Sequence, residues 1–233
     1  MFSRKSPQQF FEEGRNFLDN EKYDEAIKAF TKAIELAPTS YESYANRGLA
    51  YVKKVFTSID TVSDEQQESY GQKYLFESIK DYDKAIDILT VVIRSYESEK
   101  ELLAQVFIFR AQSNYFVRRI TEAFSDLNSA LKYDNNNPEI FEKRGMLYLD
   151  ELDDPELAIE DFSKAIRIQP SAQVYIYRCW AHIENKDPDT AVKDYKRAKA
   201  LDIDFVKNSQ RTRSLFKLRQ WEQFMEEADK LLF

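Results

Sequence analysis

The side chains that most often act as nucleophile, general base or metal ligand are scarce in this sequence. It contains one cysteine, Cys179, and one histidine, His182. Cys179 occupies a position that other segments of the chain fill with glycine or alanine, which favours a small buried thiol over a reactive one. His182 lies three residues after Cys179, at a position where we expect a side chain of the helical core. We therefore expect a packed imidazole and not a ligand or a base. A single cysteine also excludes an intramolecular disulfide.

Other signatures of catalysis are missing from the sequence as well. It has no glycine-rich phosphate-binding loop, no paired cysteines at metal-ligand spacing and no nucleophile elbow. Its many carboxylates fall on helix faces that we expect to be exposed, where solvation accounts for them. We therefore expect a protein that is not an enzyme, with no catalytic residue, no metal site and no cofactor.

Composition and charge narrow the class further. The 233 residues are 32% charged and include only four glycines and six prolines, which is typical of a soluble helical protein. The formal net charge of −7 argues against nucleic acid as a partner, because neutralising phosphates needs clustered lysine and arginine. One basic stretch, 207–219, is interpreted as a solvated helical face, with a phosphate or acidic partner as the alternative.

The sequence shows no recognisable targeting signal either. No apolar run approaches the roughly 18 residues that a membrane span needs. The first six residues include basic side chains, but no apolar stretch follows them as in a secretory signal. The expected location is cytoplasmic.

Three series of residues recur in register and predict the elements that carry these side chains. Small residues are separated by 34, 63, 34 and 34 positions: Gly14, Gly48, Ala111, Gly145 and Cys179. An alanine, with a large apolar residue four positions later, follows each of them: Ala26 and Phe30, Ala85 and Leu89, Ala123 and Leu127, Ala158 and Phe162, Ala191 and Tyr195. A period near 34 with small residues in fixed phase predicts an array of helix pairs. The small residues let two helices approach closely, and large side chains fill the space around the crossing.

Capping signals divide the chain into about twelve helices. Ser6 with Gln9 reads as a capping box ahead of a proline at the first helical position, and Thr39 with Glu42 and Ser98 with Glu101 read as further capping boxes. Three more helices are expected to start where a capping side chain directly precedes proline, at Asn137, Asp154 and Asp187.

These residues resemble the tetratricopeptide repeat (TPR) family. The first repeat shows the family pattern as Phe10, Gly14, Phe17, Ala26, Phe30, Ala33 and Pro38. The fourth shows it as Phe141, Gly145, Tyr148, Ala158, Phe162, Ala165 and Pro170. The resemblance implies an all-α fold, an α-solenoid in which antiparallel helix pairs form a right-handed superhelix. We assign a single array over 1–233, with repeats at 7–40, 41–97, 104–137, 138–171 and 172–205 and a C-terminal capping helix pair at 206–233.

The second repeat is longer than the others. The 63-residue spacing indicates about 25 extra residues near 55–77. Apolar residues keep helical spacing on both sides, through Tyr51 and Val55 and again through Leu75 and Ile79, with a polar tip near Asp60–Asp64 and a cap at Ser63. We expect a projecting antiparallel hairpin, with a disordered loop as the alternative. This hairpin is the candidate for a contact surface that other repeats lack.

The resemblance implies recognition of another protein. First helices of stacked TPR units line a concave groove that holds a peptide or a helix. The family's groove positions map onto Phe11, Arg15, Leu18, Asn46, Leu49, Lys53, Ile108, Gln112, Tyr115, Phe116, Lys143, Met146, Tyr177 and Trp180. The lining is mainly apolar and aromatic, the kind of anchor that often dominates binding energy. The alternative is that some of these side chains pack between neighbouring first helices.

One partner known for the family is disfavoured. Members that bind the acidic C-terminus of heat-shock chaperones use a clamp of two lysines, two asparagines and an arginine. Asn46 matches one asparagine, but the other four positions hold Phe11, Arg15, Gln105 and Phe109. Carboxylates placed there would lack charge-assisted partners. The sequence therefore predicts a non-catalytic adaptor or scaffold with a largely apolar groove, or alternatively a constitutive subunit of a larger assembly held through the hairpin of the second repeat.

Overall fold

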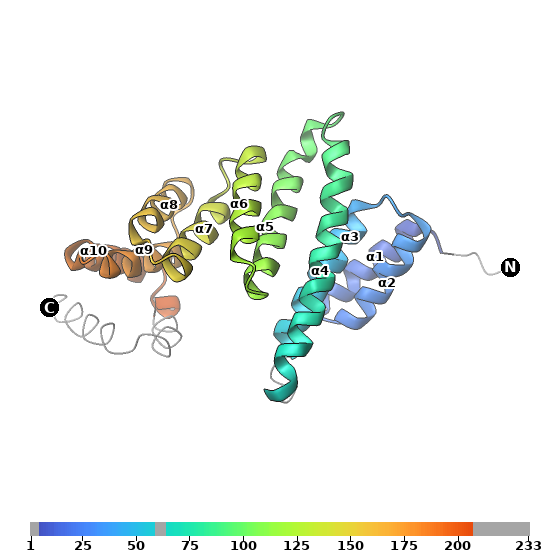
Figure 1. Cartoon of the computed structure of the whole chain (residues 1–233), viewed down its shortest axis with the longest axis horizontal. Helices are drawn as coiled ribbons and strands as arrows, with labels where there is room; N and C mark the ends of the chain where they lie inside the picture. The colour runs from blue at the N-terminus through green and yellow to red at the C-terminus, as the bar shows by residue number, and fades with distance from the viewer. Residues whose placement is uncertain (1–4, 59–63, 207–233) are drawn as a thin grey trace. The chain divides into compact units, whose positions relative to one another are not determined.

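The computed structural model describes residues 5–58 and 64–206, in which the regular secondary structure is all helical and no strand occurs (Figure 1). Two compact units divide the chain, 1–135 and 136–233, and each is described by itself. Unit 1 contains α1 (Pro7–Asp19), α2 (Tyr23–Leu36), α3 (Tyr41–Ser58), α4 (Asp64–Val92), the 3-10 turn η2 (Glu97–Glu99), α5 (Lys100–Phe116) and α6 (Ile120–Tyr133). Unit 2 contains α7 (Pro138–Glu151), α8 (Pro155–Ile168), α9 (Ala172–Glu184) and α10 (Pro188–Leu201).

Consecutive helices pack as pairs, α1 with α2, α3 with α4 and α5 with α6 in unit 1, and α7 with α8 and α9 with α10 in unit 2. The expected all-α array of helix pairs is therefore confirmed. The predicted hairpin tip with Ser63, the basic stretch 207–219 and all of the capping pair beyond Val206 lie outside the described residues.

Several helices start where the capping signals predict. The Ser6 Oγ accepts a hydrogen bond from the Gln9 backbone N–H at 3.2 Å, and the Ser6 N–H donates to Gln9 Oε1 at 2.8 Å, which completes the capping box. Asn137, Asp154 and Asp187 cap α7, α8 and α10 from the position before proline. Side-chain acceptors thus satisfy amide groups that the first turn of each helix leaves without a partner.

Two capping predictions were wrong. The α3 helix begins one residue later than expected, because Ser40 and not Thr39 accepts the backbone N–H of Ser43, at 3.3 Å. The α5 helix begins at Lys100 without a side-chain cap, and Ser98 lies within η2. The start of α3 is ambiguous in sequence because Thr39 and Ser40 are both hydroxyl residues, and the start of α5 is ambiguous because glutamates surround Ser98. In both cases the local backbone geometry decides where the helix begins.

Glycine allows close approach of the two helices at three of the repeating small positions. A Cβ atom on Gly14 would lie 2.6 Å from the Phe30 ring, and one on Gly145 would lie 2.7 Å from the Phe162 ring. On Gly48 it would lie 2.8 Å from the ring of Tyr82. Because these three rings are fully buried, they occupy the space that a side chain on the first helix would need.

Buried ion pairs join the two helices in four of the five hairpins. In each, an arginine directly before the small residue forms a two-pronged contact with an aspartate directly before the large one: Arg47 with Asp81, Arg110 with Asp126, Arg144 with Asp161, and Arg178 with Asp194. The aspartate side chains are at most 6% exposed. Removing one partner of such a pair would leave an uncompensated buried charge.

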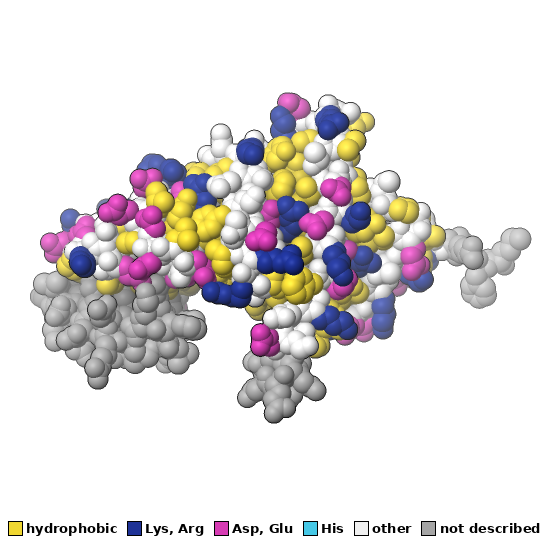
Figure 2. All heavy atoms as spheres, viewed as in Figure 1, with side chains coloured by type: hydrophobic (Ala, Val, Ile, Leu, Met, Phe, Trp, Pro, Cys, Tyr) yellow, Lys and Arg dark blue, Asp and Glu magenta, His cyan; other side chains and the backbone are white. Residues whose placement is uncertain are grey.

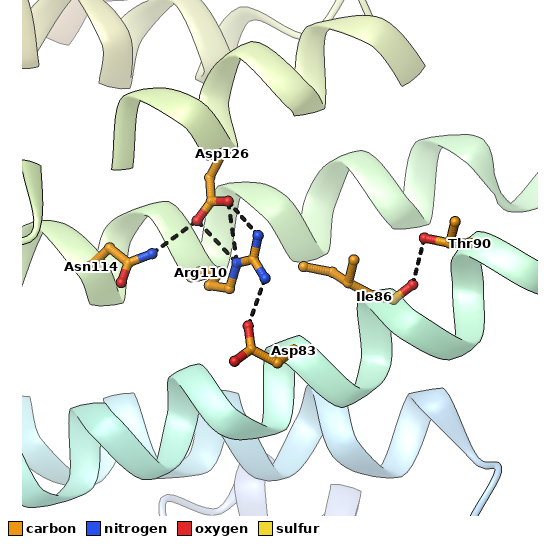
Figure 3. A network of polar contacts seen from close by, with 6 residues as sticks. All are labelled: Asp83, Ile86, Thr90, Arg110, Asn114 and Asp126. Carbon is orange, nitrogen blue, oxygen red and sulfur yellow. Dashed lines mark hydrogen bonds and ion pairs between the residues drawn. The ribbon is translucent and has the colours of Figure 1, made fainter. Parts of the chain in front are cut away.

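The same guanidinium groups link neighbouring hairpins. Three of them also donate to the residue that follows the large side chain of the preceding hairpin: Arg47 to Thr31, Arg110 to Asp83, and Arg178 to Ser163. Figure 3 shows the second of these, in which Arg110 lies between Asp126 of its own hairpin and Asp83 of α4. In the same view, the Asn114 amide donates to Asp126 at 3.0 Å. The ladder of charges therefore fixes both the register within a hairpin and the stacking between hairpins.

The ion pair corrects the repeat register of the second hairpin. Arg47 and Asp81 are 34 residues apart, whereas Arg110 and Asp126 are 16 apart, an excess of 18 between the paired residues. The large residue that covers Gly48 is accordingly Tyr82, seven positions before the predicted Leu89. The remaining extra length follows Tyr82, in the last turns of α4 and the connection to α5. Seven residues are nearly two helical turns, so both registers bury apolar side chains, and Leu89 is also fully buried.

The long hairpin is held on both sides within unit 1. On one side, the Lys54 ammonium contacts Asp24 of α2 at 2.5 Å and the Tyr74 hydroxyl at 3.2 Å, and it lies 4.4 Å from the centroid of the Tyr74 ring. Burial alone would lower the pKa of Lys54, but these hydrogen bonds raise it above its ordinary value. On the other side, the Arg119 guanidinium lies 4.9 Å from the Phe76 ring centroid. Figure 1 shows α4 extending past the end of α5.

Candidate partner-binding faces

The first helices of the pairs define two faces, one formed by α1, α3 and α5 in unit 1 and one by α7 and α9 in unit 2. The predicted groove residues lie on these helices, and their exposure separates side chains that a partner could reach from those that hold the fold together.

On α1, two of the three predicted residues pack inward. Phe11 and Leu18 lie against the buried cluster around Phe30, and the Phe11 and Phe30 rings are 5.9 Å apart. Arg15 is exposed. The apolar members therefore contribute mainly to the packing of the first hairpin.

On α3, the predicted residues form one stripe at spacings of three and four. Asn46 is half-buried and donates from its side-chain amide to the Glu42 carbonyl of its own helix at 2.8 Å. Leu49 is half-buried, and Lys53 is exposed. Phe56, which the sequence interpretation did not include, continues the stripe by a further three positions and is 44% exposed.

On α5, the accessible residues gather at the C-terminal end. Ile108 is fully buried and belongs to the core, and Gln112 is half-buried. Phe116 is 37% exposed, and its ring packs edge-on against Phe56 of α3 with centroids 4.7 Å apart. Tyr115 lies beside it, at 5.4 Å between ring centroids. We call Phe56, Tyr115 and Phe116 the aromatic patch.

In unit 2, the two predicted aromatic residues pack toward the core. Trp180 is only 8% exposed, and its ring lies 5.3 Å from that of Tyr177, which in turn lies 5.9 Å from the buried ring of Phe162. Lys143 pairs with Glu139 at 3.2 Å one turn earlier, and Met146 is half-buried.

A carboxylate neighbours these residues on the unit 2 face. The Gln173 amide of α9 donates to Glu142 of α7 at 2.6 Å, and the Tyr177 hydroxyl lies 3.1 Å from the same amide nitrogen. Burial raises the pKa of Glu142, and Lys143 and the Gln173 amide oppose this rise. The contacts join α7 to α9, so this carboxylate contributes to the packing of the two first helices.

The histidine and the cysteine of this unit fit a structural role. His182 occupies, in α9, the place of Asn114 in α5, with its imidazole Nε2 3.8 Å from the Asp194 carboxylate and Nδ1 3.6 Å from that of Asp187. Burial lowers the pKa of His182, and the neighbouring carboxylates raise it in part. Cys179 is fully buried.

Surface chemistry over the described ranges is mixed. Figure 2 shows acidic, basic and apolar side chains interspersed over α4 and its neighbours in unit 1. Within residues 5–58 and 64–206, the acidic, cysteine and histidine side chains form no group of three that could hold a metal ion. In the same part of the chain, no helix has both the length and the apolar character that crossing a membrane requires.

Comparison with known proteins points to one family. Two family models match the chain, one described as TPR repeat over residues 14–55 and one described as tetratricopeptide repeat over residues 138–171. The second coincides with the repeat assigned to 138–171 from the sequence.

The chain is also similar to a curated protein and, in fold, to two solved structures. The chain is 27% identical over 158 residues to DnaJ homolog subfamily C member 3 of Gallus gallus, a match that covers 66% of this chain and 28% of that protein. The chain spans less than a third of the curated relatives it matches. The structure of MamA superposes with a TM-score of 0.61 at 19% identity, covering 83% of this chain and 96% of that one. YrrB, described as a TPR protein with an unusual peptide-binding site, superposes with a TM-score of 0.59 at 14% identity, covering 87% and 91%. At these identities the two structures show the fold alone.

Proposed function

We propose that this chain, which belongs to the tetratricopeptide repeat family, is a non-catalytic adaptor that binds a segment of another protein on the first-helix face of unit 1. The observation that carries the proposal is the aromatic patch. Two phenylalanine side chains from different hairpins, Phe56 and Phe116, meet at the surface and remain more than a third exposed. Exposed aromatic side chains held by a rigid scaffold are typical anchors for a partner.

The patch has the rigidity that an anchor needs. Phe56 lies at the C-terminal end of α3, two residues after Lys54, which is tied to α2 and α4. Phe116 ends α5, whose register is fixed by the Arg110 ion pair. A partner would therefore meet side chains that are already positioned, which lowers the entropy lost on binding.

The test is affinity capture with the full chain and two single variants, followed by identification of the captured proteins. Phe116→Ala removes one anchor and should abolish capture of a specific partner. Tyr96→Ala is the matched control, because Tyr96 is 65% exposed in the connection between α4 and α5, away from the patch in sequence. Equal capture by the wild-type chain and both variants would contradict the proposal, provided that circular dichroism shows unchanged helix content.

The bracing of the long hairpin favours a second function, that of a constitutive subunit held in a larger assembly through this hairpin. Contacts on both sides, at Lys54 and at Phe76, hold its base within unit 1. Replacing residues 59–63 by a glycine–serine linker should then release the chain from its complex in size-exclusion fractionation, while Phe116→Ala should not. Persistent co-fractionation of the linker variant would exclude this function.

A further inference from the structure

The aromatic patch lies beside an exposed cation, Lys53. Lys53 is exposed and precedes Phe56 by three residues, so the two side chains are neighbours on one face of α3. Over the described ranges, Lys53 forms no ion pair, whereas the adjacent Lys54 is half-buried and pairs with Asp24. On the other helices of this unit's face, Arg15 of α1 is likewise an exposed cation.

Among the stripe residues of α3 and α5 that surround the aromatic patch, the only charged side chain is positive. The uncharged residues of this set are Asn46, Leu49 and Phe56 on α3 and Gln112, Tyr115 and Phe116 on α5. Lys53 supplies the only charge in this set, and Arg118 and Arg119 lie in the connection that follows α5. A partner that covers the patch would partly desolvate the Lys53 ammonium, and a carboxylate on the partner would compensate for that loss.

Resting on the proposed function, we infer that the partner segment is acidic and apolar: it carries a large apolar side chain for the patch and a carboxylate, about one helical turn away, for Lys53. The spacing follows from α3 itself, because side chains three residues apart on a helix have Cβ atoms roughly 5–6 Å apart. Apolar contact with Phe56 and Phe116 provides the affinity, and the carboxylate provides selectivity over neutral and basic segments.

The test is selection from a random displayed peptide library on the immobilised full chain. Peptides that bind the wild-type chain should be enriched in large apolar residues and in aspartate or glutamate. The variant Lys53→Glu should lose the acidic preference and acquire a preference for lysine and arginine. Lys28→Glu is the matched control: it makes the same charge change at an exposed position of α2 and should keep the wild-type preference.

The outcomes separate this inference from the proposed function. The inference would be overturned if peptide binding requires Phe116 but shows no preference for acidic residues, or shows one that Lys53→Glu leaves unchanged. The proposed binding face would still be supported by such a result. No enrichment at all, or enrichment that Phe116→Ala leaves intact, would overturn both. For a selected peptide, replacing its acidic residue by the amide should weaken binding to the wild-type chain about two- to five-fold in fluorescence anisotropy, and not to Lys53→Gln.

Discussion

The two glycines of the long hairpin should respond in opposite ways to the same substitution. Gly48 in α3 and Gly71 in α4 both occupy helix interiors, where alanine is more favourable than glycine by about 1 kcal/mol. At Gly71 the added Cβ would meet Val55 at 3.6 Å, an ordinary van der Waals contact, so Gly71→Ala should stabilise the protein by up to about 1 kcal/mol. At Gly48 the Cβ would lie 2.8 and 2.9 Å from two atoms of the fully buried Tyr82 ring.

Overpacking of this kind costs about 1–3 kcal/mol, and a rigid buried ring places Gly48 toward the upper part of that range. After the gain in helix propensity, Gly48→Ala should lose about 1–2 kcal/mol. Thermal unfolding followed by circular dichroism should therefore give a lower midpoint for Gly48→Ala and a higher one for Gly71→Ala, with changes of about 2–4 °C per kcal/mol. A Gly48→Ala variant as stable as the wild type would refute the close approach at this crossing, and equal losses in both variants would refute the comparison.

Three further predictions concern unit 2. Arg144→Leu should lose about 3 kcal/mol in urea denaturation because it leaves Asp161, 2% exposed, with only the longer contact to Lys164 at 3.4 Å. The double variant with Asp161→Leu should lose markedly less, and equal losses would argue against the buried pair. Trp180→Ala should lose about 3–5 kcal/mol because the side chain is mostly buried, and a loss of binding without a loss of stability would place it on a free surface instead. The single histidine, His182, should titrate in NMR with a pKa below its ordinary value of 6.5. Because the unfolded chain then binds more protons than the folded one, the free energy of unfolding should fall as the pH drops through and below 6.5. His182→Asn should remove this contribution, and a measured pKa above 6.5 would contradict the burial of the imidazole.

The sequence contained the signal for the buried ion pairs, but the pattern of small and large residues concealed it. Arginine directly precedes the small residue in four of five hairpins, for example at Arg144 before Gly145. Aspartate directly precedes the large residue in the same four, for example at Asp161 before Phe162. Polar residues are ordinarily assigned to exposed faces, and only the pairing of the two series indicates burial.

Apolar spacing predicted the helix pairs but could not fix the register of the long one. Ala85 and Leu89 match the repeat pattern as well as residues two turns earlier do, because positions seven apart lie on nearly the same side of a helix. The Arg47–Asp81 pair and the contact of Gly48 with Tyr82 decide between the two registers. The two-pronged contact between Arg47 and Asp81 fixes which turns of the two helices face each other, whereas an apolar side chain can pack against several neighbours.

The exposure of the groove positions depended on neighbours that the sequence does not specify. Trp180 and Ile108 occupy family groove positions yet are covered by packing. Phe56 lies near the end of α3, which is longer than the other first helices, and it is 44% exposed. Continuing the three–four spacing of Asn46 and Lys53 along α3 would have identified it.

Site-specific photocrosslinking tests the central claim most directly. A photoreactive phenylalanine analogue introduced at position 116, in the aromatic patch, should yield a discrete covalent adduct with one partner protein in cells, whereas the same analogue at position 96 should not. Adduct formation from position 116 should also diminish when Phe56→Ala is added, because the two rings form one contact surface. An adduct from position 96 with none from position 116 would contradict the assignment of the binding face.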